Sequence, residues 1–289
     1  MPLLRRLENK VAIVTGGGTG LGEAIAHKFA QEGARVVVNG LPGDPVQDVV
    51  QAIEAKGGFA EAFIGDVADP EQARKCVQSA IDCFGQLNIL INNAGVFLAS
   101  AEVDKYSIDL FDETVTKNIR SVFLMTRFAV PELQKTAGNI ISTGSESGTL
   151  GLAQNTPYGG TKGWIHAFMK GVAVEQAKHG IRANCVCPGP MDTAWTHKES
   201  GPMDAQAERN SIAATPMGRR GTPEEVANVF AFLASDMASY VTGAVWAVDG
   251  GTIVGKGSMA EAPRGVQSEG GNGLALEHAL NGNGLVTVR

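Results

Sequence analysis

The chain has few of the features that mark secreted, membrane-bound or nucleic-acid-binding proteins. Its 289 residues include only 4 cysteines, too few for a disulfide framework. No block of Lys or Arg is present and the formal net charge is −6, so an electrostatic footprint for nucleic acid or anionic membrane is lacking. No run approaches the roughly 20 apolar residues that span a bilayer, and residues 1–10 contain no apolar signal core. We expect a soluble, cytoplasmic protein that binds neither nucleic acid nor membrane.

The four cysteines are predicted to have packing roles. Cys76 and Cys83 lie seven residues apart in a helical pattern, whereas Cys185 and Cys187 alternate along an apolar segment typical of a strand. No histidine stands at ligand spacing beside either pair. The sequence therefore predicts no metal site.

Short apolar runs alternate with segments of helical periodicity along most of the chain. Val11–Val14 is an apolar run ended by glycines, and apolar residues then recur at helical spacing from Leu21 to Phe29, before Gly33. The alternation predicts an α/β fold, a single-domain Rossmann-type doubly wound parallel sheet of about seven strands flanked by helices, over residues 1–251. Among the expected helices are 70–84, 110–133, 158–179 and 223–234.

Two segments break the alternation. Residues 190–217 lack a clear strand and contain Thr, Ser, Met and Trp195, so we interpret them as a substrate lid. Residues 252–289 form a Gly-rich C-terminal tail without strong periodicity. Its composition favours a flexible terminus, with an arm over a neighbouring subunit or the active-site mouth as the alternative.

A glycine-rich turn follows the first expected strand. It matches T-G-x-x-x-G-x-G, with Gly16, Gly20 and Gly22 in the glycine positions. Such a turn lets backbone N–H groups approach a pyrophosphate at a helix N-terminus. We therefore expect the turn to bind a dinucleotide through residues that also include Gly18, Thr19 and Leu21.

The end of the second strand decides between NAD and NADP. An acid there would hold the ribose 2′-hydroxyl of NAD, and a cation the 2′-phosphate of NADP. This chain has Asn39-Gly40-Leu41 there, and Thr19 stands where a cation would help to bind the phosphate. Either nucleotide stays possible, and the absence of a cation favours NAD. Asp44 is interpreted as a turn residue, and Gly40→Asp is expected to strengthen the preference for NAD.

Tyr158 and Lys162 are four residues apart, about one helical turn, so both project from one helix face. An ammonium beside a phenol favours the phenolate and makes tyrosine a usable acid/base nearer neutrality. Ser145 stands thirteen residues before the tyrosine. Together with the glycine turn, this spacing predicts hydride transfer between a nicotinamide and a carbonyl or alcohol carbon.

These motifs resemble the short-chain dehydrogenase/reductase family over residues 7–251. The resemblance also rests on Asp66-Val67, Asn92-Asn93-Ala94-Gly95, Asn118, the run Pro188-Gly189-Pro190-Met191-Asp192-Thr193 and Val248-Asp249-Gly250-Gly251. It implies that Asp66 and Val67 hold the adenine, that Asn93, Ala94 and Gly95 line the ribose side, and that Pro188, Gly189, Met191 and Thr193 contact the nicotinamide end. It further implies that Lys162 holds the nicotinamide ribose and that the protein is a homotetramer.

The same resemblance implies the catalytic roles. Tyr158 would be the general acid/base, Ser145 would hydrogen-bond the substrate oxygen, and Asn118 would anchor a water that relays protons from Lys162. Apolar residues around the expected pocket favour a cyclic or medium-sized secondary alcohol or ketone as the small-molecule substrate. These pocket residues are Phe97, Leu98, Leu150, Leu152, Met191 and Trp195.

Two alternative functions stay open. The first is a reductase of 3-oxoacyl groups on an acyl carrier protein, which in that family is gripped by two arginines; the corresponding positions here are Pro131 and Val174. The second is a nicotinamide-sensing protein without turnover, which retention of both Tyr158 and Lys162 disfavours. A serine hydrolase is a poor match, because Glu146 occupies the nucleophile position of the segment 144–148.

Overall fold

The chain folds around one parallel β-sheet, which the computed structural model describes over residues 5–192 and 205–255. Seven strands pair in the order β3-β2-β1-β4-β5-β6-β7. The sheet therefore reverses its winding between β1 and β4, and the crevice at the carboxyl ends of those strands is the usual place for a ligand in such a fold. The strands are β1 (Val11–Val14), β2 (Arg35–Gly40), β3 (Phe59–Ile64), β4 (Ile89–Asn92), β5 (Asn139–Thr143), β6 (Arg182–Pro188) and β7 (Val245–Val248). The predicted fold class is confirmed.

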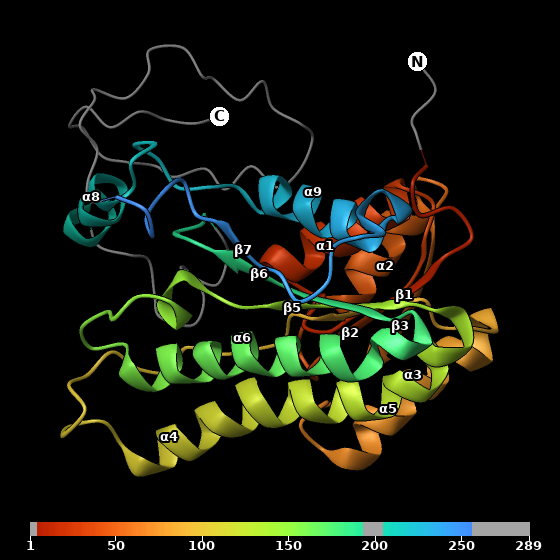
Figure 1. Ribbon diagram of the computed structural model, residues 1–289, viewed down its shortest axis with the longest axis horizontal. Coiled ribbons are helices and arrows are strands. Elements are labelled where there is room, and N and C mark those ends of the chain that lie inside the picture. Colours follow the sequence, from red (N-terminus) through yellow and green to blue (C-terminus); the bar gives the residue numbers. More distant parts are fainter. Residues whose placement is uncertain (1–4, 193–204, 256–289) are drawn as a thin grey trace.

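Helices cover both faces of the sheet (Figure 1). One face carries α1 (Gly20–Gln31), α2 (Val46–Glu54) and α9 (Pro223–Ala234), and the other carries α3 (Pro70–Phe84), α5 (Ser121–Thr136) and α6 (Thr156–Gln176). Two further helices, α4 (Ile108–Val115) and α8 (Ala205–Ala214), lie toward one end of the molecule.

The strands are apolar because both of their faces are buried. Along β1, Ala12 and Val14 pack into the core beneath α1, α2 and α9, whereas Val11 and Ile13 pack into the core beneath α3, α5 and α6. This alternation of faces along a strand explains why the sequence shows continuous apolar runs rather than alternating polar and apolar residues. Two hydrophobic cores result, separated by the sheet.

Local capping fixes the helices that the sequence predicted best. The carboxylate of Asp69 accepts the N–H groups of Glu71 and Gln72 at 2.9 Å each, which starts α3 at Pro70. Gly85 ends the same helix in the left-handed region, at φ 82°. At α9, Thr222 and Glu225 form a reciprocal capping box. The predicted bounds 70–84 and 223–234 are confirmed.

Two predicted segments differ from the observed structure. The helix expected over 110–133 is interrupted by a π-helical turn, Thr116–Arg120, between α4 and α5. The segment interpreted as a lid contains α8, which its weak periodicity did not predict. Residues 193–204, and the tail from residue 256, lie outside the described residues, so the proposed lid and the domain boundary at 251 stay predictions.

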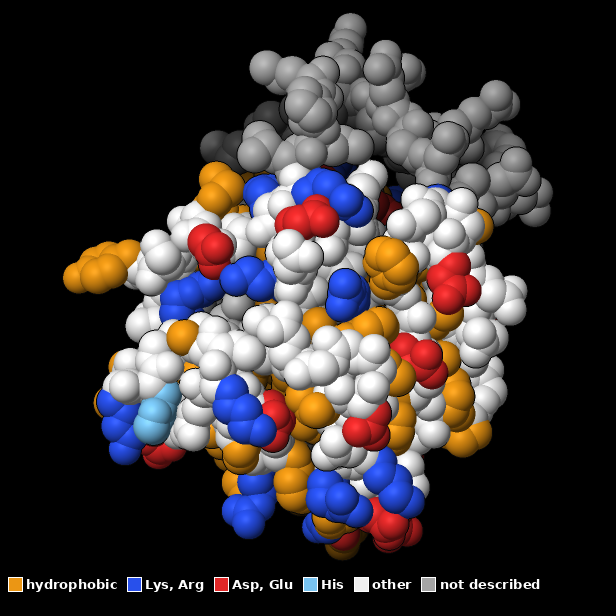
Figure 2. All heavy atoms as spheres, turned by 90° about the vertical axis from the view of Figure 1, so that its right-hand side faces the viewer, with side chains coloured by type: hydrophobic (Ala, Val, Ile, Leu, Met, Phe, Trp, Pro, Cys, Tyr) orange, Lys and Arg blue, Asp and Glu red, His pale blue; other side chains and the backbone are white. Residues whose placement is uncertain are grey.

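The surface in Figure 2 carries charges of both signs. On this face, the right-hand side of Figure 1, Lys and Arg side chains alternate with Asp and Glu and with hydrophobic patches. No helix among the described residues has the length and apolar character that crossing a membrane requires.

Candidate active site

In the glycine turn between β1 and α1, Gly16 and Gly22 have no room for a side chain. Gly16 has φ +60°, and a Cβ on Gly22 would stand 2.0 Å from the carbonyl oxygen of Gly16. Thr19 precedes the helix, and its side chain makes no capping hydrogen bond to the first turn of α1. The N–H groups of that turn are therefore available to a ligand. The bare turn and the uncapped helix N-terminus fit the pyrophosphate of a dinucleotide.

The segment after β4 holds this turn in place. The side-chain amide of Asn93 donates to the carbonyl oxygens of Thr15 and Gly16, at 3.1 and 3.2 Å. The Thr15 hydroxyl oxygen accepts the N–H groups of Asn93 and Ala94, at 2.9 and 3.1 Å. Asn93 and Ala94 therefore brace the glycine turn, and their predicted contact with the ribose stays a prediction. Asn93 also accepts a hydrogen bond from Thr143, at 3.1 Å, which links the turn to the end of β5.

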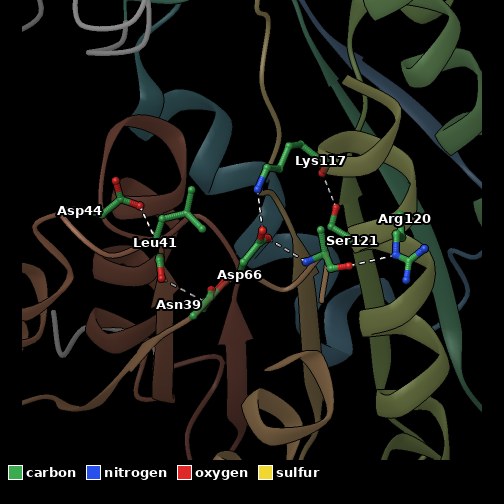
Figure 3. Close-up of polar contacts among 10 residues, drawn as sticks. Asn39, Leu41, Asp44, Asp66, Lys117, Arg120 and Ser121 are labelled. Carbon is green, nitrogen blue, oxygen red and sulfur yellow. Dashed lines mark hydrogen bonds and ion pairs between the residues drawn. The ribbon is translucent and has the colours of Figure 1, made fainter. Parts of the chain in front are cut away.

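Asp66 lies just beyond the carboxyl end of β3 (Figure 3). Its carboxylate accepts a hydrogen bond from Lys117 at 2.6 Å and one from the N–H of Ala68 at 3.0 Å. Partial burial raises the pKa of Asp66, but the hydrogen bonds from Lys117 and the Ala68 N–H, together with the positive charge of Lys117, lower it by more, so the net pKa is lowered. Val67 is buried in the core, so only its backbone can face an adenine there.

The end of β2 is arranged differently from our expectation. Asn39 is buried, and its amide donates to the carbonyl oxygens of Phe63 and Gly65, at 3.1 and 2.9 Å, so it braces β3. A Cβ on Gly40 would lie 2.4 Å from a methyl carbon of Val46. The substitution Gly40→Asp suggested by the sequence was therefore a poor test, because position 40 has no room for a side chain.

Asp44 is the acid that lies beside this strand end (Figure 3). Its carboxylate accepts the N–H of Leu41 at 2.7 Å, which confirms the interpretation as a turn residue. Its side chain also borders the glycine turn, since a Cβ on Gly18 would stand 3.2 Å from the Asp44 Cβ. The turn aspartate thus stands where strand β2 and the glycine turn meet.

Three of the four expected catalytic residues, Ser145, Tyr158 and Lys162, lie where the segment after β5 meets α6. Ser145 follows β5, is buried, and accepts the N–H of Ser147 at 3.2 Å. Tyr158 lies in the first turns of α6, where it is hydrogen-bonded to Ser145. The ring of Phe97 meets the Tyr158 ring edge-on, with centroids 5.4 Å apart. An apolar wall therefore flanks a hydrogen-bonded pair of hydroxyl groups.

Lys162 does not pair directly with the phenol oxygen in this structure. Its Nζ atom donates to the carbonyl oxygen of Thr143 at 2.9 Å and lies 5.5 Å from the centre of the Tyr158 ring. Burial raises the pKa of Tyr158 to about 12, the hydrogen bond with Ser145 lowers it, and the nearby Glu146 raises it further. The lowered tyrosine pKa that we expected from Lys162 is therefore not found in this structure.

Asn118 lies in the π turn and is fully buried. Its side chain accepts the N–H of Val96 at 2.7 Å and donates to the Val96 carbonyl at 2.9 Å and to the Thr161 hydroxyl at 3.1 Å. Gly95 lies against it, because a Cβ there would stand 3.1 Å from Asn118 Oδ1 and 3.6 Å from Lys162 Nζ. The amide thus braces the catalytic helix. Sequence periodicity gave no signal of the π turn, a feature frequent at functional sites.

Only some of the residues that we expect to contact the nicotinamide lie among the described residues. Gly189, after β6, lies so close to Asp249 that a Cβ would stand 2.7 Å from the Asp249 Cα. Met191 pairs with Gly221 in an isolated parallel bridge, which fixes the start of the segment interpreted as a lid. Thr193 and Trp195 lie outside the described residues, and their predicted contacts stay predictions.

A second cluster lies behind the segment that carries Ser145. Its members are Cys185 and Cys187 of β6 and His166 of α6, with 3.0 Å between Cys187 Sγ and His166 Nε2. All three are buried. Sequence reasoning missed the cluster because His166 is 21 residues from Cys187 and reaches it only when α6 packs on β6.

Comparison with known proteins agrees with this geometry. The profile of a family described as enoyl-(acyl carrier protein) reductase matches residues 16–252. A solved structure of a mutant Serratia marcescens short-chain dehydrogenase/reductase superposes with a TM-score of 0.79 at 32% identity, covering 86% of this chain and 99% of that one. The chain belongs to the short-chain dehydrogenase/reductase family. It is therefore an NAD(P)-dependent oxidoreductase that acts on CH–OH groups.

Three curated relatives illustrate the chemistry found among similar members of the short-chain dehydrogenase/reductase family. L-rhamnose 1-dehydrogenase (NAD(P)(+)) of Sphingomonas sp. is 39% identical, over 87% of this chain and 99% of the relative. Cyclohexanol dehydrogenase of Acinetobacter sp. is 36% identical, over 85% and 95%. A 3-oxoacyl-[acyl-carrier-protein] reductase of Thermotoga maritima is 34% identical, over 86% and 100%.

The buried ammonium of Lys162 gives a testable dependence of stability on pH. Burial lowers the pKa of Lys162 to about 8, from 10.5, so the folded chain gives up this proton at lower pH than the unfolded chain. Below about pH 8 the folded state carries the full cost of a buried charge, and that cost disappears as pH rises toward the unfolded pKa. The contribution of Lys162 to stability therefore increases with pH in this window.

We expect the variant Lys162→Met to lose this pH dependence. The loss should appear as a change with pH in the difference between the unfolding free energies of the parent chain and the variant. Denaturant unfolding at about pH 7 and about pH 9.5 should show the parent gaining about 2 kcal/mol relative to the variant. Lys170→Met, on the same helix, should show no such relative change. A difference between parent and Lys162→Met that stays constant with pH would contradict the buried, shifted amine.

Proposed function

We propose that the chain transfers a hydride between NAD(P) and a secondary alcohol or ketone that is cyclic or medium-sized and apolar. The observation that carries the proposal is the hydrogen-bonded pair of Ser145 and Tyr158, with Lys162 one turn along the same helix and the bare glycine turn nearby. Acid/base chemistry at a substrate oxygen needs a group able to exchange a proton and a donor to the same oxygen. Tyr158 and Ser145 supply these two functions.

The nucleotide would be held at the carboxyl ends of the strands by the residues that the sequence predicts for it. The turn formed by Gly16, Gly18, Thr19, Gly20, Leu21 and Gly22 would take the pyrophosphate, with Asp66 and Val67 at the adenine, Asn93, Ala94 and Gly95 on the ribose side, and Pro188, Gly189, Met191 and Thr193 at the nicotinamide. When bound, NAD(P) supplies the acceptor or donor of the hydride. The N-terminus of α1, which has no side-chain cap, supports this placement of the pyrophosphate, because its N–H groups favour an anion.

In the oxidation direction, the phenolate of Tyr158 takes the proton of the substrate hydroxyl as the carbon that bears this hydroxyl loses its hydride. Ser145 donates a hydrogen bond to the substrate oxygen and stabilises its developing negative charge. Because burial raises the pKa of Tyr158 to about 12, its phenolate requires positive charge nearby. The ammonium of Lys162 supplies part of that charge, and Asn118 holds Thr161 and Val96 so that the lysine keeps its position.

The walls beside Tyr158 support an apolar substrate. Phe97 packs edge-on against the tyrosine ring, and Leu98 and Leu150 are half-buried on neighbouring segments. Leu152 is 38% exposed, which leaves it available to a ligand. Two relatives are named for cyclohexanol and L-rhamnose, both of which carry hydroxyl groups on a six-membered ring. A cyclic secondary alcohol fits this combination.

A 3-oxoacyl-[acyl-carrier-protein] reductase is the second candidate, favoured by the name of one relative. An acidic carrier protein would need cations on the helices that flank the site. The two expected positions carry Pro131, inside α5, and Val174, which is 81% exposed on α6. The first proposal is therefore better supported. Assaying ketones in free form and as acyl-carrier thioesters separates the two, since only the second candidate prefers the thioester.

Asp44 supports a preference for NAD. Its carboxylate stands where the end of β2 meets the glycine turn, so it would oppose the doubly negative 2′-phosphate of NADP. The nearby cations shown in Figure 3 are engaged elsewhere, Lys117 with Asp66 and Arg120 with the carbonyl oxygen of Ala68. The proposal is that this aspartate takes over the role usually given to an acid at the strand end.

Two exposed apolar surfaces support a homotetramer. One lies on α4, α5 and α6, where Ile108 is 78% and Val174 81% exposed. The other lies near β7, where Tyr240 is fully exposed and Trp246 is 40% exposed. Two separate self-complementary surfaces per chain generate a closed tetramer. A cytoplasmic location belongs to the same proposal, since an exposed free thiol such as Cys83 suits a reducing compartment.

Replacement of the phenol tests the central proposal. Tyr158→Phe should lower kcat for cyclohexanol oxidation by about 10² to 10⁴-fold, the range typical of a lost acid/base group. NADH binding, followed by nucleotide fluorescence, should stay within twofold or so of the parent. Tyr106→Phe serves as the control and should retain activity. A parent chain that binds nucleotide but turns over none of a panel of alcohols and ketones would instead indicate a sensor.

Removal of the Asp44 charge tests the nucleotide preference. Asp44→Asn keeps an acceptor for the Leu41 N–H but removes the negative charge, so kcat/KM with NADP should rise on the order of tenfold relative to NAD. Asp48→Asn removes a neighbouring exposed charge and should leave the ratio unchanged. An unchanged ratio in Asp44→Asn would show that the 2′ position lies elsewhere.

Charge placed on one apolar surface tests the oligomer. Light scattering after gel filtration should give a mass of four chains for the parent and of two for Ile108→Glu combined with Val174→Glu, because both substitutions bury charge at a single interface. Lys135→Glu, an exposed change on α5, should leave the tetramer intact. A monomeric parent at micromolar concentration would refute the proposal.

A further inference from the structure

Two cysteine sulfur atoms and one imidazole nitrogen converge in the interior, beneath the segment that carries Ser145. Cys187 Sγ lies 3.0 Å from His166 Nε2 and 3.9 Å from Cys185 Sγ, and all three atoms are within 4.8 Å of one another. Each residue is at most 8% exposed. The cluster lies behind the segment that carries Ser145.

Three elements build this cluster. Cys185 and Cys187 alternate along β6 and so present their sulfur atoms on one face of the sheet. His166 stands one helical turn after Lys162 on the buried side of α6. Gly144, at the end of β5, leaves the necessary space, since a Cβ there would stand 2.5 Å from His166 Nε2 and 2.7 and 2.8 Å from the two sulfur atoms. Any larger residue at 144 would collide with all three ligand atoms.

The separation of the two sulfur atoms matches a tetrahedral thiolate site. Two thiolates bound at 2.3 Å in tetrahedral geometry are about 3.8 Å apart, close to the observed 3.9 Å between the cysteines. A thiolate and an imidazole on the same ion are about 3.5 Å apart, so the His166–Cys187 separation needs to open by about 0.5 Å. We propose that His166, Cys185 and Cys187 bind one Zn²⁺ ion.

The charge balance suits a buried position. Two thiolates and one neutral imidazole neutralise Zn²⁺, and the two thiol protons are released to solvent on binding. The resulting neutral group adds no net charge beside the buried Lys162. A cation without thiolate ligands would instead add uncompensated positive charge to the interior.

A cavity of about 450 Å³ gives access to the cluster. Its walls include His166 and Cys187, together with Gly148, Thr149, Gly163 and Lys170. Water from this side supplies the fourth ligand, which gives a Cys₂His site with one open position. The cavity also provides the path by which the ion enters.

Oxidation to a disulfide is a less suitable use of the two cysteines. Their sulfur atoms would have to approach to about 2.05 Å, which draws together alternate residues of one extended strand. Both residues are also held in register, Cys185 opposite Ser142 of β5 and Val245 of β7, and Cys187 opposite Ala247. The ion instead joins β6 and α6 directly behind Gly144 and Ser145, and so stabilises the segment that positions the serine.

Cobalt substitution tests the site by a signal that does not depend on enzyme activity. The chain carrying Cys83→Ser, which removes the exposed thiol, is treated with chelator and titrated with Co²⁺ under anaerobic conditions. We expect one equivalent to give the intense visible bands of tetrahedral cobalt and a thiolate-to-cobalt charge-transfer band, and Zn²⁺ to displace it. Zn²⁺ should also raise the midpoint of thermal unfolding.

Matched variants assign the ligands in the same background. His166→Gln and Cys187→Ser should each weaken Co²⁺ binding at least on the order of tenfold, whereas Cys76→Ser, which changes a buried thiol of helix α3, should leave it unchanged. Far-ultraviolet circular dichroism and NADH binding establish that the variants are folded. Absence of a thiolate-to-cobalt band in the folded Cys83→Ser chain would overturn the proposal, as would bands that persist in both ligand variants.

Discussion

The ammonium of Lys162 is the group around which the site is organised. It is 4% exposed, and it reaches the end of β5 through its hydrogen bond to the Thr143 carbonyl. Burying a positive charge at this depth is unfavourable, which is why its pKa falls to about 8. A residue that costs stability is retained where function requires it. Its position on α6, one turn after Tyr158, fixes where the proposed proton transfer would occur.

Neighbouring polar groups keep that amine in position. Gly95 makes room above it, and Asn118 ties the segment after β4 to Thr161 on α6. On the other side, Asn93 connects Thr143 to the glycine turn. A continuous set of buried and part-buried hydrogen bonds therefore joins the proposed nucleotide site to the proposed acid/base pair. Such networks are stable only when their members are satisfied, so changes at one end should be felt at the other.

The sequence predicted most of the fold because its strands are buried on both faces and its helices begin and end at strong signals, such as Asp69 and Gly85 for α3. It also predicted that Ser145, Tyr158 and Lys162 meet, since their spacing follows from one strand end and one helical turn. It failed where tertiary packing decides: the π turn at Asn118, the inward-facing Asn39 and the direction of the Lys162 amine have no local pattern.

The same limit explains why the sequence did not predict the cluster of His166, Cys185 and Cys187 behind Ser145. Spacing along a sequence can reveal ligands that share one element, as Cys185 and Cys187 do, but His166 joins them only through the packing of α6 on β6. Gly144 is equally uninformative until its neighbours are known. Because the segment 144–148 is packed between the cluster on one side and Tyr158 on the other, ordering of the cluster and positioning of Ser145 are physically coupled. An ion bound behind Gly144 would thus act on catalysis through the position of the serine hydroxyl rather than through contact with substrate.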